Sequence, residues 1–470
     1  MKIIIFAILI GLIEAKPNLL IILADDMGYG DLGCQGSTTI KTPHLDELAK
    51  RGVRCTQGYV ASSVCSPSRA GLLTGRDPRR FGYEGNLNQN SAQYATRPEL
   101  LGLPITENTI ADQLKPLGYH TALIGKWHLG TSAEFHPNQR GFDHFVGMLR
   151  GSHSYFPDSK KNGIERNGQP IDHFSSSYLT DFFSDEAVNW VTDHQHEPWF
   201  LLLSYNAPHT PMQAKEEDLQ LYSMIQDPKR RAYAAMIHAM DRGIGRLVES
   251  LKKTQQLRDT LVVFLSDNGG ATTNASWNGS LSGKKGSLRE GGIRVPFIFS
   301  WPERLPQDHL CKSVVSSLDL VPTFVNAAGG KLLPLRQPPT YEDSRNRRKY
   351  AQLFGDYDGL NLLPVLEESD QSPRKRSLFW RLQGQAAILD GQLKLIRPSH
   401  RSAQLFEPAN DLGEQHDLSA EQIEQRDLLF QKLAEWESLR PTVPLWGSSP
   451  FWNRQSAQIY DSSPPLPEPK

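Results

Sequence analysis

The stretch Leu19-Leu-Ile-Ile-Leu-Ala24, followed at once by Asp25-Asp26, decides the fold class of this chain. Six consecutive apolar residues without alternation are typical of a strand that is covered on both faces. Further runs of the same character lie at 121–124, 199–205, 261–266 and 297–300. Helical patterns separate them, at 44–51, 109–117, 178–194 and 230–253. Because strands alternate with helices, we predict an α/β fold with a large, mostly parallel central sheet flanked by helices.

After residue 376 the pattern changes to short apolar segments separated by turns such as Asp390-Gly391. Segments 378–382, 385–389 and 393–396 resemble short strands, and a helical pattern covers about 420–439. This pattern predicts a small C-terminal antiparallel sheet with one helix. The expected parts of the chain are a signal peptide at 1–15, a large α/β domain at 16–372, a small α+β subdomain at 373–440 and a Pro-rich tail at 441–470. Within the large domain, 330–372 is expected to be a linker or surface insertion.

The first residues combine the cation Lys2 with an apolar run at 3–13 that ends at Glu14-Ala15-Lys16. The run is too short to span a bilayer, and it fits a signal peptide cut near Ala15. The alternative is a buried N-terminal strand. No cysteine stands at the cleavage point, and no later stretch is apolar and long enough for a membrane helix. We therefore expect export without a membrane span, to the periplasm or the extracellular space, or to lysosomal or secretory compartments in a eukaryotic cell.

Charge and cysteine content argue against several classes of protein. The 470 residues carry a formal net charge of -1, which gives no sign of a nucleic-acid partner. The four cysteines, Cys34, Cys55, Cys65 and Cys311, are too few for a disulfide scaffold. A bridge between Cys34 and Cys55 stays open at this point.

Polar residues follow several predicted strands at the point where each strand ends. They are Asp25-Asp26 after the first strand, Lys126 and His128 after 121–124, His209 after 199–205 and Asp267-Asn268 after 261–266. In open α/β sheets ligands bind beyond the carboxyl ends of the strands, so we expect these side chains to converge. Three carboxylates and an amide oxygen suit Ca²⁺ or Mg²⁺ rather than zinc. The alternative is that the acidic pairs only cap helices or form turns.

A second group of residues lies in the segment Cys65-Ser-Pro67-Ser-Arg69-Ala-Gly-Leu-Leu-Thr-Gly75. Pro67 favours the first turn of a helix, and Gly75 is suited to end it. Cys65 would then lie at a helix N-terminus, where the helix dipole favours negative charge. Taken alone, this makes Cys65 a candidate thiolate nucleophile. The alternative is a buried cysteine that precedes a packed helix.

The segment around Cys65 and Arg69 resembles the sequence motif of type I sulfatases, the formylglycine-dependent arylsulfatase family of the alkaline phosphatase superfamily. Other stretches agree with this family in its own order: 25–31, 125–130, 266–269, Lys285 with Glu290-Gly-Gly-Ile-Arg294, and 390–396. The resemblance runs from about residue 17 to 436, nearly the whole chain. It implies an enzyme that releases inorganic sulfate from a sulfated small molecule or saccharide. It also implies that a formylglycine-generating enzyme converts Cys65 to formylglycine (3-oxoalanine) during maturation.

The resemblance also implies roles for individual residues. One divalent cation, Ca²⁺ with Mg²⁺ as the alternative, would be held by Asp25, Asp26, Cys65, Asp267 and Asn268. The catalytic set would be Cys65, Arg69, Lys126, His128, His209 and Lys285. In this set Arg69 steadies residue 65, and the lysines and histidines bind the sulfate and the leaving oxygen. Lys284 is the second choice for Lys285, and a sulfate-contacting serine is expected near Ser152.

The chemistry of a sulfate monoester explains these residue types. Charge spreads over the equatorial oxygens during attack at sulfur, as in phosphoryl transfer, so positioning and electrostatics supply most of the catalysis. A formylglycine hydrate has two hydroxyls: one attacks sulfur, and loss of the proton from the other allows sulfate to leave. We expect His209, with Lys285, to protonate the leaving oxygen, and His128 to take the second hydroxyl's proton.

Two other functions compete with this one. The first is hydrolysis of phosphate or phosphonate monoesters by the same type of site. The second is a non-catalytic secreted binding protein on the same scaffold, because fold does not guarantee function.

Specificity is expected to reside in the loops at 81–103, 153–173 and 274–283. Trp277, Tyr155 and Phe156 are candidates for stacking on sugar rings, although ordinary packing is the stronger expectation for each. Asn274 and Asn278 stand in glycosylation sequons, which matter only in a eukaryotic secretory pathway.

Overall fold

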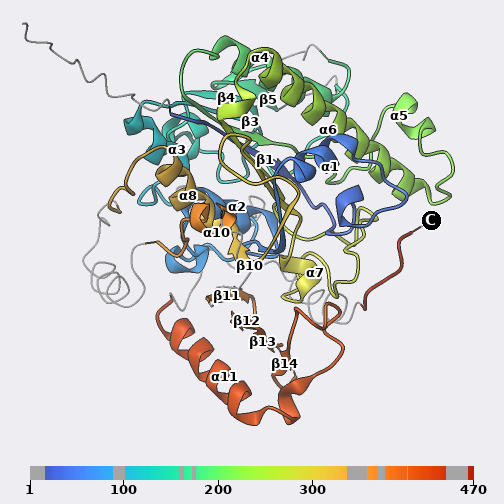
Figure 1. The fold of residues 1–470 in the computed structure, drawn as a ribbon, viewed down its shortest axis with the longest axis vertical. Coiled ribbons are helices and arrows are strands. Elements are labelled where there is room, and N and C mark those ends of the chain that lie inside the picture. Colours follow the sequence, from blue (N-terminus) through green and yellow to red (C-terminus); the bar gives the residue numbers. More distant parts are fainter. Residues whose placement is uncertain are drawn as a thin grey trace, which may run out of the picture.

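The computed structural model describes residues 16–87, 101–157, 163–171, 176–335, 357–367, 376–399, 401–440 and 464–469. The expected signal peptide and most of the expected Pro-rich tail lie outside these residues, as does the boundary expected at 372. The described chain forms a large ten-stranded sheet flanked by helices and a separate four-stranded sheet, which Figure 1 shows below it. No helix among the described residues is long and apolar enough to cross a membrane.

The centre of the large sheet consists of four parallel neighbours. They are β8 (Thr260–Ser266), β1 (Asn18–Ala24), β7 (Trp199–Ser204) and β3 (His120–Lys126). Towards one edge follow β4 (His144–Met148), β5 (Ile164–Arg166) and β6 (Gln169–Pro170). Towards the other edge follow β9 (Phe297–Ser300), β2 (Val53–Tyr59) and β10 (His309–Ser316). The predicted α/β class with a mostly parallel sheet is confirmed, although β9 runs antiparallel to both neighbours.

Helices cover both faces of the sheet, which is why β1 is apolar without alternation (Figure 1). Leu19, Ile21 and Leu23 pack into one core with α2 (Cys65–Thr74), α3 (Ile110–Leu114) and α8 (Leu320–Ala327). Leu20, Ile22 and Ala24 pack into a second core with α1 (Pro43–Lys50), α4 (Leu179–Asp193) and α6 (Pro228–Lys253). A buried Leu or Ile side chain contributes about 1.5–3 kcal/mol through the hydrophobic effect. The central run therefore stabilises both layers at once.

The small sheet is antiparallel, in the order β11 (Ser377–Leu382), β12 (Gln385–Asp390), β13 (Leu393–Arg397) and β14 (Gln404–Phe406). Helix α11 (Ile423–Ser438) covers one face, where Leu429, Leu433 and Trp436 pack on Ile388 and Leu395. The other face joins the core of the large sheet through residues such as Trp380. The predicted C-terminal sheet and helix are confirmed, and the two sheets share a hydrophobic core.

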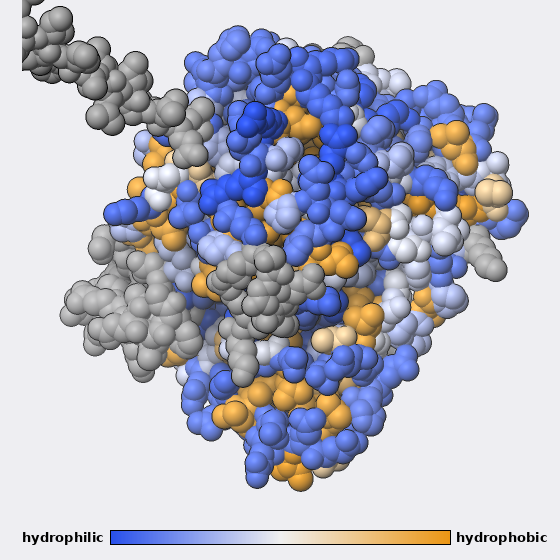
Figure 2. Space-filling model, viewed as in Figure 1, coloured by the Kyte–Doolittle hydropathy of each residue, from blue (hydrophilic) through white to orange (hydrophobic). Residues whose placement is uncertain are grey.

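Shorter helices complete the described fold: α5 (Glu216–Gln220), α7 (Glu290–Ile293) and α10 (Leu363–Glu367). Helix α10 lies in the segment that was expected to be a linker or insertion. Figure 2 shows that hydrophilic residues dominate the upper part of this face of the molecule. Hydrophobic residues are interspersed with them at the lower end, where α11 lies in Figure 1.

All four cysteines are free thiols. The bridge between Cys34 and Cys55 that the sequence left open is therefore not formed. Cys55 instead lies opposite Cys311 in the register of β2 and β10.

Candidate active site

Four central strands deliver polar residues to one edge of the sheet. β1 ends at Ala24 and is followed by Asp25, and β8 ends at Ser266 and is followed by Asp267. β3 ends at Lys126, and His209 follows β7 within five residues. Because these strands are parallel neighbours, the convergence predicted from the sequence is found in the structure.

Asp25, Asp26 and Asp267 are all at most 2% exposed. The backbone N–H of Asp26 donates to Asp267 Oδ1 at 3.2 Å, which ties the ends of β1 and β8 together. Asp26 has a φ of 62°, in the left-handed region that residues other than glycine seldom adopt. This turn directs the two consecutive carboxylates into the same site.

Burial and neighbouring charges separate the pKa values of these carboxyl groups. Burial alone raises the pKa of Asp25, but Lys126, His209 and Arg69 outweigh it and hold that pKa well below its usual range. Burial and the charge of Asp25 raise the pKa of Asp267 to about 6. Of the three carboxyl groups, Asp267 therefore depends most on a neighbouring positive charge to remain ionised.

Arg69 meets this need from helix α2. Its guanidinium lies 2.9 Å from Asp267 Oδ2 and donates to Ser204 Oγ at 2.7 Å and to the carbonyl of Lys126 at 3.1 Å. These bonds link α2 to the ends of three central strands. The first turn of the same helix carries Cys65, so Arg69 fixes where residue 65 lies.

Cys65 is the first residue of α2, and Gly75 ends that helix in a left-handed conformation, as predicted. Its Sγ lies 2.9 Å from Lys285 Nζ and 3.6 Å from carboxylate oxygens of both Asp25 and Asp26. Burial raises the pKa of the Cys65 thiol, although Lys126 and Lys285 oppose the effect. Burial therefore favours the protonated form of the unmodified thiol.

Two lysines balance the two consecutive carboxylates. Lys126 Nζ donates to Asp25 Oδ2 at 2.6 Å, and Lys285 Nζ donates to Asp26 Oδ1 at 2.5 Å. Burial would lower the pKa of Lys285, but Asp26 and its neighbours hold it well above its ordinary value. Lys285 therefore keeps its proton and its charge within the site.

The two histidines lie at the margin of this cluster. His209 Nδ1 donates to the carbonyl of Thr210 at 2.6 Å, and Nε2 lies 3.6 Å from Asp26 Oδ2. Burial lowers the pKa of His209 despite the nearby aspartates. Burial, Lys126 and Arg69 lower the pKa of His128 well below its ordinary value, and its Nδ1 has no hydrogen-bond partner among the described residues. Both rings are therefore neutral at neutral pH.

The donor set at this edge suits a hard cation. Three carboxylates, from Asp25, Asp26 and Asp267, face three cations, from Arg69, Lys126 and Lys285, so the cluster is formally neutral with both histidines uncharged. Oδ1 of Asn268 is buried and has no hydrogen-bond partner in the described part of the chain. Ligand atoms of Asp25, Asp26, Cys65 and His209 lie within 4.8 Å of one another. A divalent cation would satisfy the Asn268 oxygen and give the site a net positive charge for an anionic substrate.

Comparison with known proteins identifies the family. The family model for sulfatases matches residues 17–330. The chain belongs to the sulfatase family. Within this family, it is 35% identical over 329 residues to mouse Arylsulfatase J and 32% identical over 368 residues to pig N-acetylgalactosamine-6-sulfatase. These alignments cover 68% and 74% of this chain but 53% and 66% of the relatives, so this sulfatase spans about half to two thirds of their lengths.

The fold also agrees with that of a solved structure. The crystal structure of Ps i-CgsB in complex with k-i-k-neocarrahexaose has a TM-score of 0.82 and 36% sequence identity. The match covers 94% of this chain and 98% of that chain. This agreement supports the fold class predicted from the sequence.

The structure also shows where the residues with weaker expectations lie. Lys284 Nζ turns away to the carbonyl of Ser276 at 3.4 Å, so Lys285 is the lysine in the cluster. Ser152 is exposed in the loop after β4. Tyr155 is fully buried and Phe156 packs on the core, so packing explains both aromatic side chains. The Trp277 indole donates to the carbonyl of Leu466 at 2.6 Å.

Both sequon asparagines have structural roles. Asn274 is fully buried, and its Nδ2 donates to the carbonyls of Asp26 at 3.0 Å and Pro208 at 3.2 Å. Asn278 is 4% exposed, and its Oδ1 accepts from the backbone of Gly270 at 3.0 Å. Neither side chain is accessible for glycosylation in the folded protein.

Two residues that support the site, Ser204 and Asn274, were not predicted as part of it from the sequence. Ser204 bridges Arg69 and the carbonyl of Lys126, with both hydrogen bonds at 2.7 Å. A polar residue at the end of a buried strand was the available signal for it, as for Asp25. Asn274 holds the turn that carries Asp26, but its sequence context indicated only a sequon.

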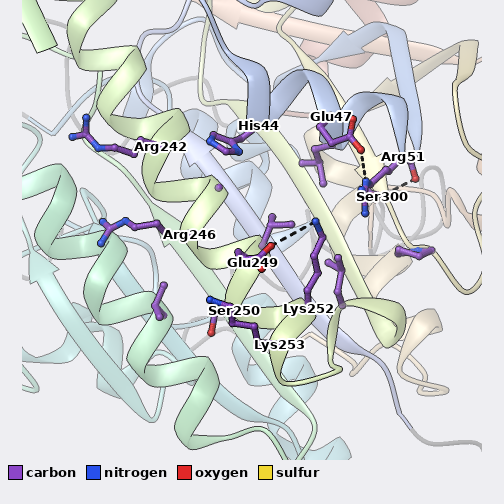
Figure 3. A pocket seen from close by; sticks show the side chains of 16 residues that line it. His44, Glu47, Arg51, Arg242, Arg246, Glu249, Ser250, Lys252, Lys253 and Ser300 are labelled. Carbon is purple, nitrogen blue, oxygen red and sulfur yellow. Dashed lines mark hydrogen bonds and ion pairs between the residues drawn. The ribbon is translucent and has the colours of Figure 1, made fainter.

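A groove of about 690 Å³ between α1 and α6 lies elsewhere on the molecule (Figure 3). It reaches Leu257 and Ser300, which lie where β8 begins and where β9 ends, at the opposite edge of the sheet from Asp267. Its lining includes Arg51, Arg242, Arg246, Lys252 and Lys253 together with Glu47 and Glu249. The groove therefore contains the same kinds of charged side chain as the buried cluster.

Proposed function

We propose that this sulfatase releases inorganic sulfate from a sulfated carbohydrate, through a formylglycine derived from Cys65 and one bound divalent cation, Ca²⁺. The observation that carries the proposal is the position of Cys65 Sγ. It lies 2.9 Å from Lys285 Nζ and 3.6 Å from two carboxylates, in a buried cluster assembled from four strands and α2.

The cation would be held by Asp25, Asp26, Asp267 and Asn268 together with residue 65. Carboxylate and amide oxygens favour Ca²⁺ or Mg²⁺, and the unpartnered Oδ1 of Asn268 fits this role. When bound, such an ion polarises sulfuryl oxygens and stabilises a deprotonated hydroxyl.

The state of residue 65 follows from its burial. As a cysteine it keeps its proton, because burial raises the pKa of the thiol. As formylglycine, its hydrate would supply one hydroxyl for attack at sulfur and a second whose deprotonation releases sulfate. Arg69, held by Asp267 and Ser204, keeps the start of α2 and residue 65 in place for both steps.

The cations and histidines of the cluster then have separate tasks. Lys126 and Lys285 bind the sulfuryl oxygens, where charge grows during attack at sulfur. An anionic ester beside the His209 imidazole favours its protonated form, so that His209 Nε2, with Lys285, can protonate the leaving oxygen. His128, neutral in the resting site, is suited to accept the proton of the second hydroxyl.

The substrate class rests on the relatives. Ps i-CgsB is described with a neocarrahexaose, and the pig relative is an N-acetylgalactosamine-6-sulfatase. We infer a sulfated saccharide for this chain too. The compartment would be exported, periplasmic or extracellular, or lysosomal or secretory in a eukaryotic cell, and maturation would require a formylglycine-generating enzyme. The division at 372 into a catalytic domain and a small subdomain is part of the same proposal.

The experiment compares ester classes with one enzyme preparation that carries formylglycine at residue 65. Sulfated carrageenan and glycosaminoglycan oligosaccharides, 4-nitrophenyl sulfate, 4-nitrophenyl phosphate and a phosphonate monoester are each assayed for release of anion. We expect sulfate release that chelation abolishes and Ca²⁺ restores. Faster release from the phosphate or phosphonate esters would favour the competing hydrolase function, and release from none of them would favour a binding protein.

A further inference from the structure

A carboxylate of the small C-terminal subdomain binds both ends of the loop that carries Lys285. Oε2 of Glu414 accepts from Ser282 Oγ at 2.7 Å and from the backbone N–H of Glu290 at 2.9 Å. These two residues lie on either side of Lys285, and the N–H of Gly291 closes the loop on the carbonyl of Ser282 at 2.6 Å. One carboxylate oxygen therefore holds both ends of the loop.

Lys394, the second residue of β13, binds the same carboxylate, and we call Glu414 and Lys394 together the clasp. Its Nζ donates to Glu414 Oε1 at 2.9 Å and to Glu290 Oε1 at 2.7 Å. Glu290 Oε2 accepts from Tyr59 OH at 2.8 Å and from Arg294 at 3.2 Å. These contacts join α7, β2 and the small sheet through one charged network.

The network is buried as deeply as the active site. Lys394 and Glu290 are 0% exposed and Glu414 is 4% exposed. Burying charges is costly, and replacing a buried ion network by apolar residues is often neutral or stabilising, so stability alone is a weak reason for such a network. Its geometry indicates a different use, because it joins the small sheet to the segment that enters the active site.

The backbone of the same loop is also hydrogen-bonded to the segment that precedes Cys65 and to Gly270. The N–H of Lys285 donates to the carbonyl of Gly270 at 3.1 Å, and the N–H of Gly286 donates to the carbonyl of Ser63 at 2.9 Å. Ser63 precedes Cys65 by two residues. The backbone of Lys285 is thus held between the start of α2 and the clasp, which sets the 2.9 Å separation of Lys285 Nζ and Cys65 Sγ.

We propose that Glu414, with Lys394, is a positioning residue that holds Lys285 against residue 65 and the leaving oxygen. The small C-terminal subdomain thereby takes part in catalysis although none of its described residues is in the cluster around Cys65. The proposal rests on the function of Lys285 proposed above. Loss of the clasp would let the loop shift, and a misplacement of about 1 Å can cost on the order of 100-fold in rate.

The test uses the full chain with formylglycine at residue 65 and 4-nitrophenyl sulfate and a sulfated oligosaccharide as probes. The variants are Glu414→Ala, Glu414→Gln and Lys394→Met, each alone and combined with Lys285→Ala. Glu437→Ala is the matched control, because Glu437 pairs with Arg397 at 2.5 Å within the same subdomain. Circular dichroism and thermal unfolding establish that each variant is folded.

We expect Glu414→Ala to lower kcat by about tenfold or more with little change in KM, and Glu414→Gln, which keeps an acceptor, to lose less. In the Lys285→Ala background, Glu414→Ala should lower kcat less than about twofold. The reason is that the effects of substitutions are not additive when one residue acts through the other. Losses that multiply in the double variant, or losses equal to those of Glu437→Ala, would overturn the proposal.

Hydrogen exchange of the peptide covering 282–292 provides a readout that does not need turnover. Exchange should be faster in Glu414→Ala and unchanged in Glu437→Ala. Unchanged exchange in Glu414→Ala would overturn the clasp whatever the enzyme's activity. If the unsubstituted protein releases no anion while exchange behaves as expected, the clasp stands and the proposed function fails.

Discussion

Two regions of this molecule contain the same kinds of charged side chain in different surroundings. In the groove between α1 and α6, Arg51 pairs with Glu47 and Lys252 with Glu249, and these cations are 40% and 39% exposed (Figure 3). In the cluster around Cys65, Lys126 and Asp25 pair at 2.6 Å with both side chains fully buried.

The two regions also differ in how they are assembled. The groove pairs join residues three or four apart on a single helix, which any exposed helix can form. Exposed pairs of this kind contribute about 0–1 kcal/mol. The buried cluster joins side chains at the ends of β1, β3, β7 and β8 with side chains of α2, which are far apart in the sequence. Each of its buried charges would be costly without an opposite charge beside it. Charge content therefore does not identify a site, whereas convergence and burial do.

The largest expected effect is that of Cys65→Ser, which tests whether the buried cluster is centred on residue 65. A serine can accept sulfate but lacks the second hydroxyl that releases it. We expect turnover to fall by about 10⁴-fold or more, with a sulfated enzyme accumulating. Mass spectrometry of the intact protein after incubation with substrate measures the trapped sulfate. Multiple turnovers by this variant would contradict the release mechanism.

The next effect compares two adjacent lysines. Lys285→Ala removes the cation beside residue 65, and we expect kcat to fall by about 100-fold. Lys284→Ala removes a lysine whose Nζ points to Ser276, and we expect it to keep most of the activity. Steady-state assays on the same sulfate ester measure both. Equal losses in the two variants would show that the cluster does not select Lys285.

A smaller effect is expected at Glu468, whose burial is intermediate between that of the cluster and that of the groove. Its side chain is 12% exposed and accepts hydrogen bonds from residues 37–39. Burial would raise its pKa, but hydrogen bonds from Ser37, Thr39 and Thr38 lower it to about 2. Because the pKa of Glu468 is lower in the folded protein, its ionised carboxylate stabilises the fold at pH values above its ordinary pKa of 4.5. This stabilisation is lost as the pH falls towards about 2. Hydrogen exchange of the Thr38 and Thr39 amides, which donate to Glu468, should therefore accelerate as the pH falls through that range, relative to the intrinsic exchange rate at each pH. Glu468→Gln should show fast exchange at all these pH values, and a pH response in that variant equal to the unsubstituted protein's would contradict this.

The smallest effect is expected in the groove. Lys252→Ala removes an exposed partner of Glu249, so the free energy of unfolding should change by no more than about 0.5 kcal/mol. Sulfate release should be unchanged within about twofold. Thermal unfolding and the same steady-state assay check both values. A large loss of activity would mean that the groove takes part in substrate binding and that the comparison between the regions is wrong.

The sequence was sufficient for the features that local patterns encode. The run at 19–24 predicted a strand covered on both faces, and polar residues at strand ends predicted the edge where Asp25 and Asp267 meet. The pattern from Pro67 to Gly75 predicted α2. The order of family motifs directed attention to Cys65 and to Lys285 rather than Lys284.

Other features depend on distant contacts that no local pattern reveals. β2 carries the polar residues Arg54, Thr56 and Gln57, so it does not resemble the central strands. Glu414 lies in an irregular segment, and only the packing of the small sheet brings it to the loop at 282–290. The antiparallel direction of β9 likewise follows from the order of the strands in the sheet rather than from its own four residues.

The most direct test of the proposed nucleophile is the mass of the peptide that contains residue 65, from protein made in its own host. We predict the mass of formylglycine at that position. An unmodified cysteine in active, mature protein would contradict it, because the buried thiol keeps its proton and the proposed release of sulfate requires the two hydroxyls of the hydrate.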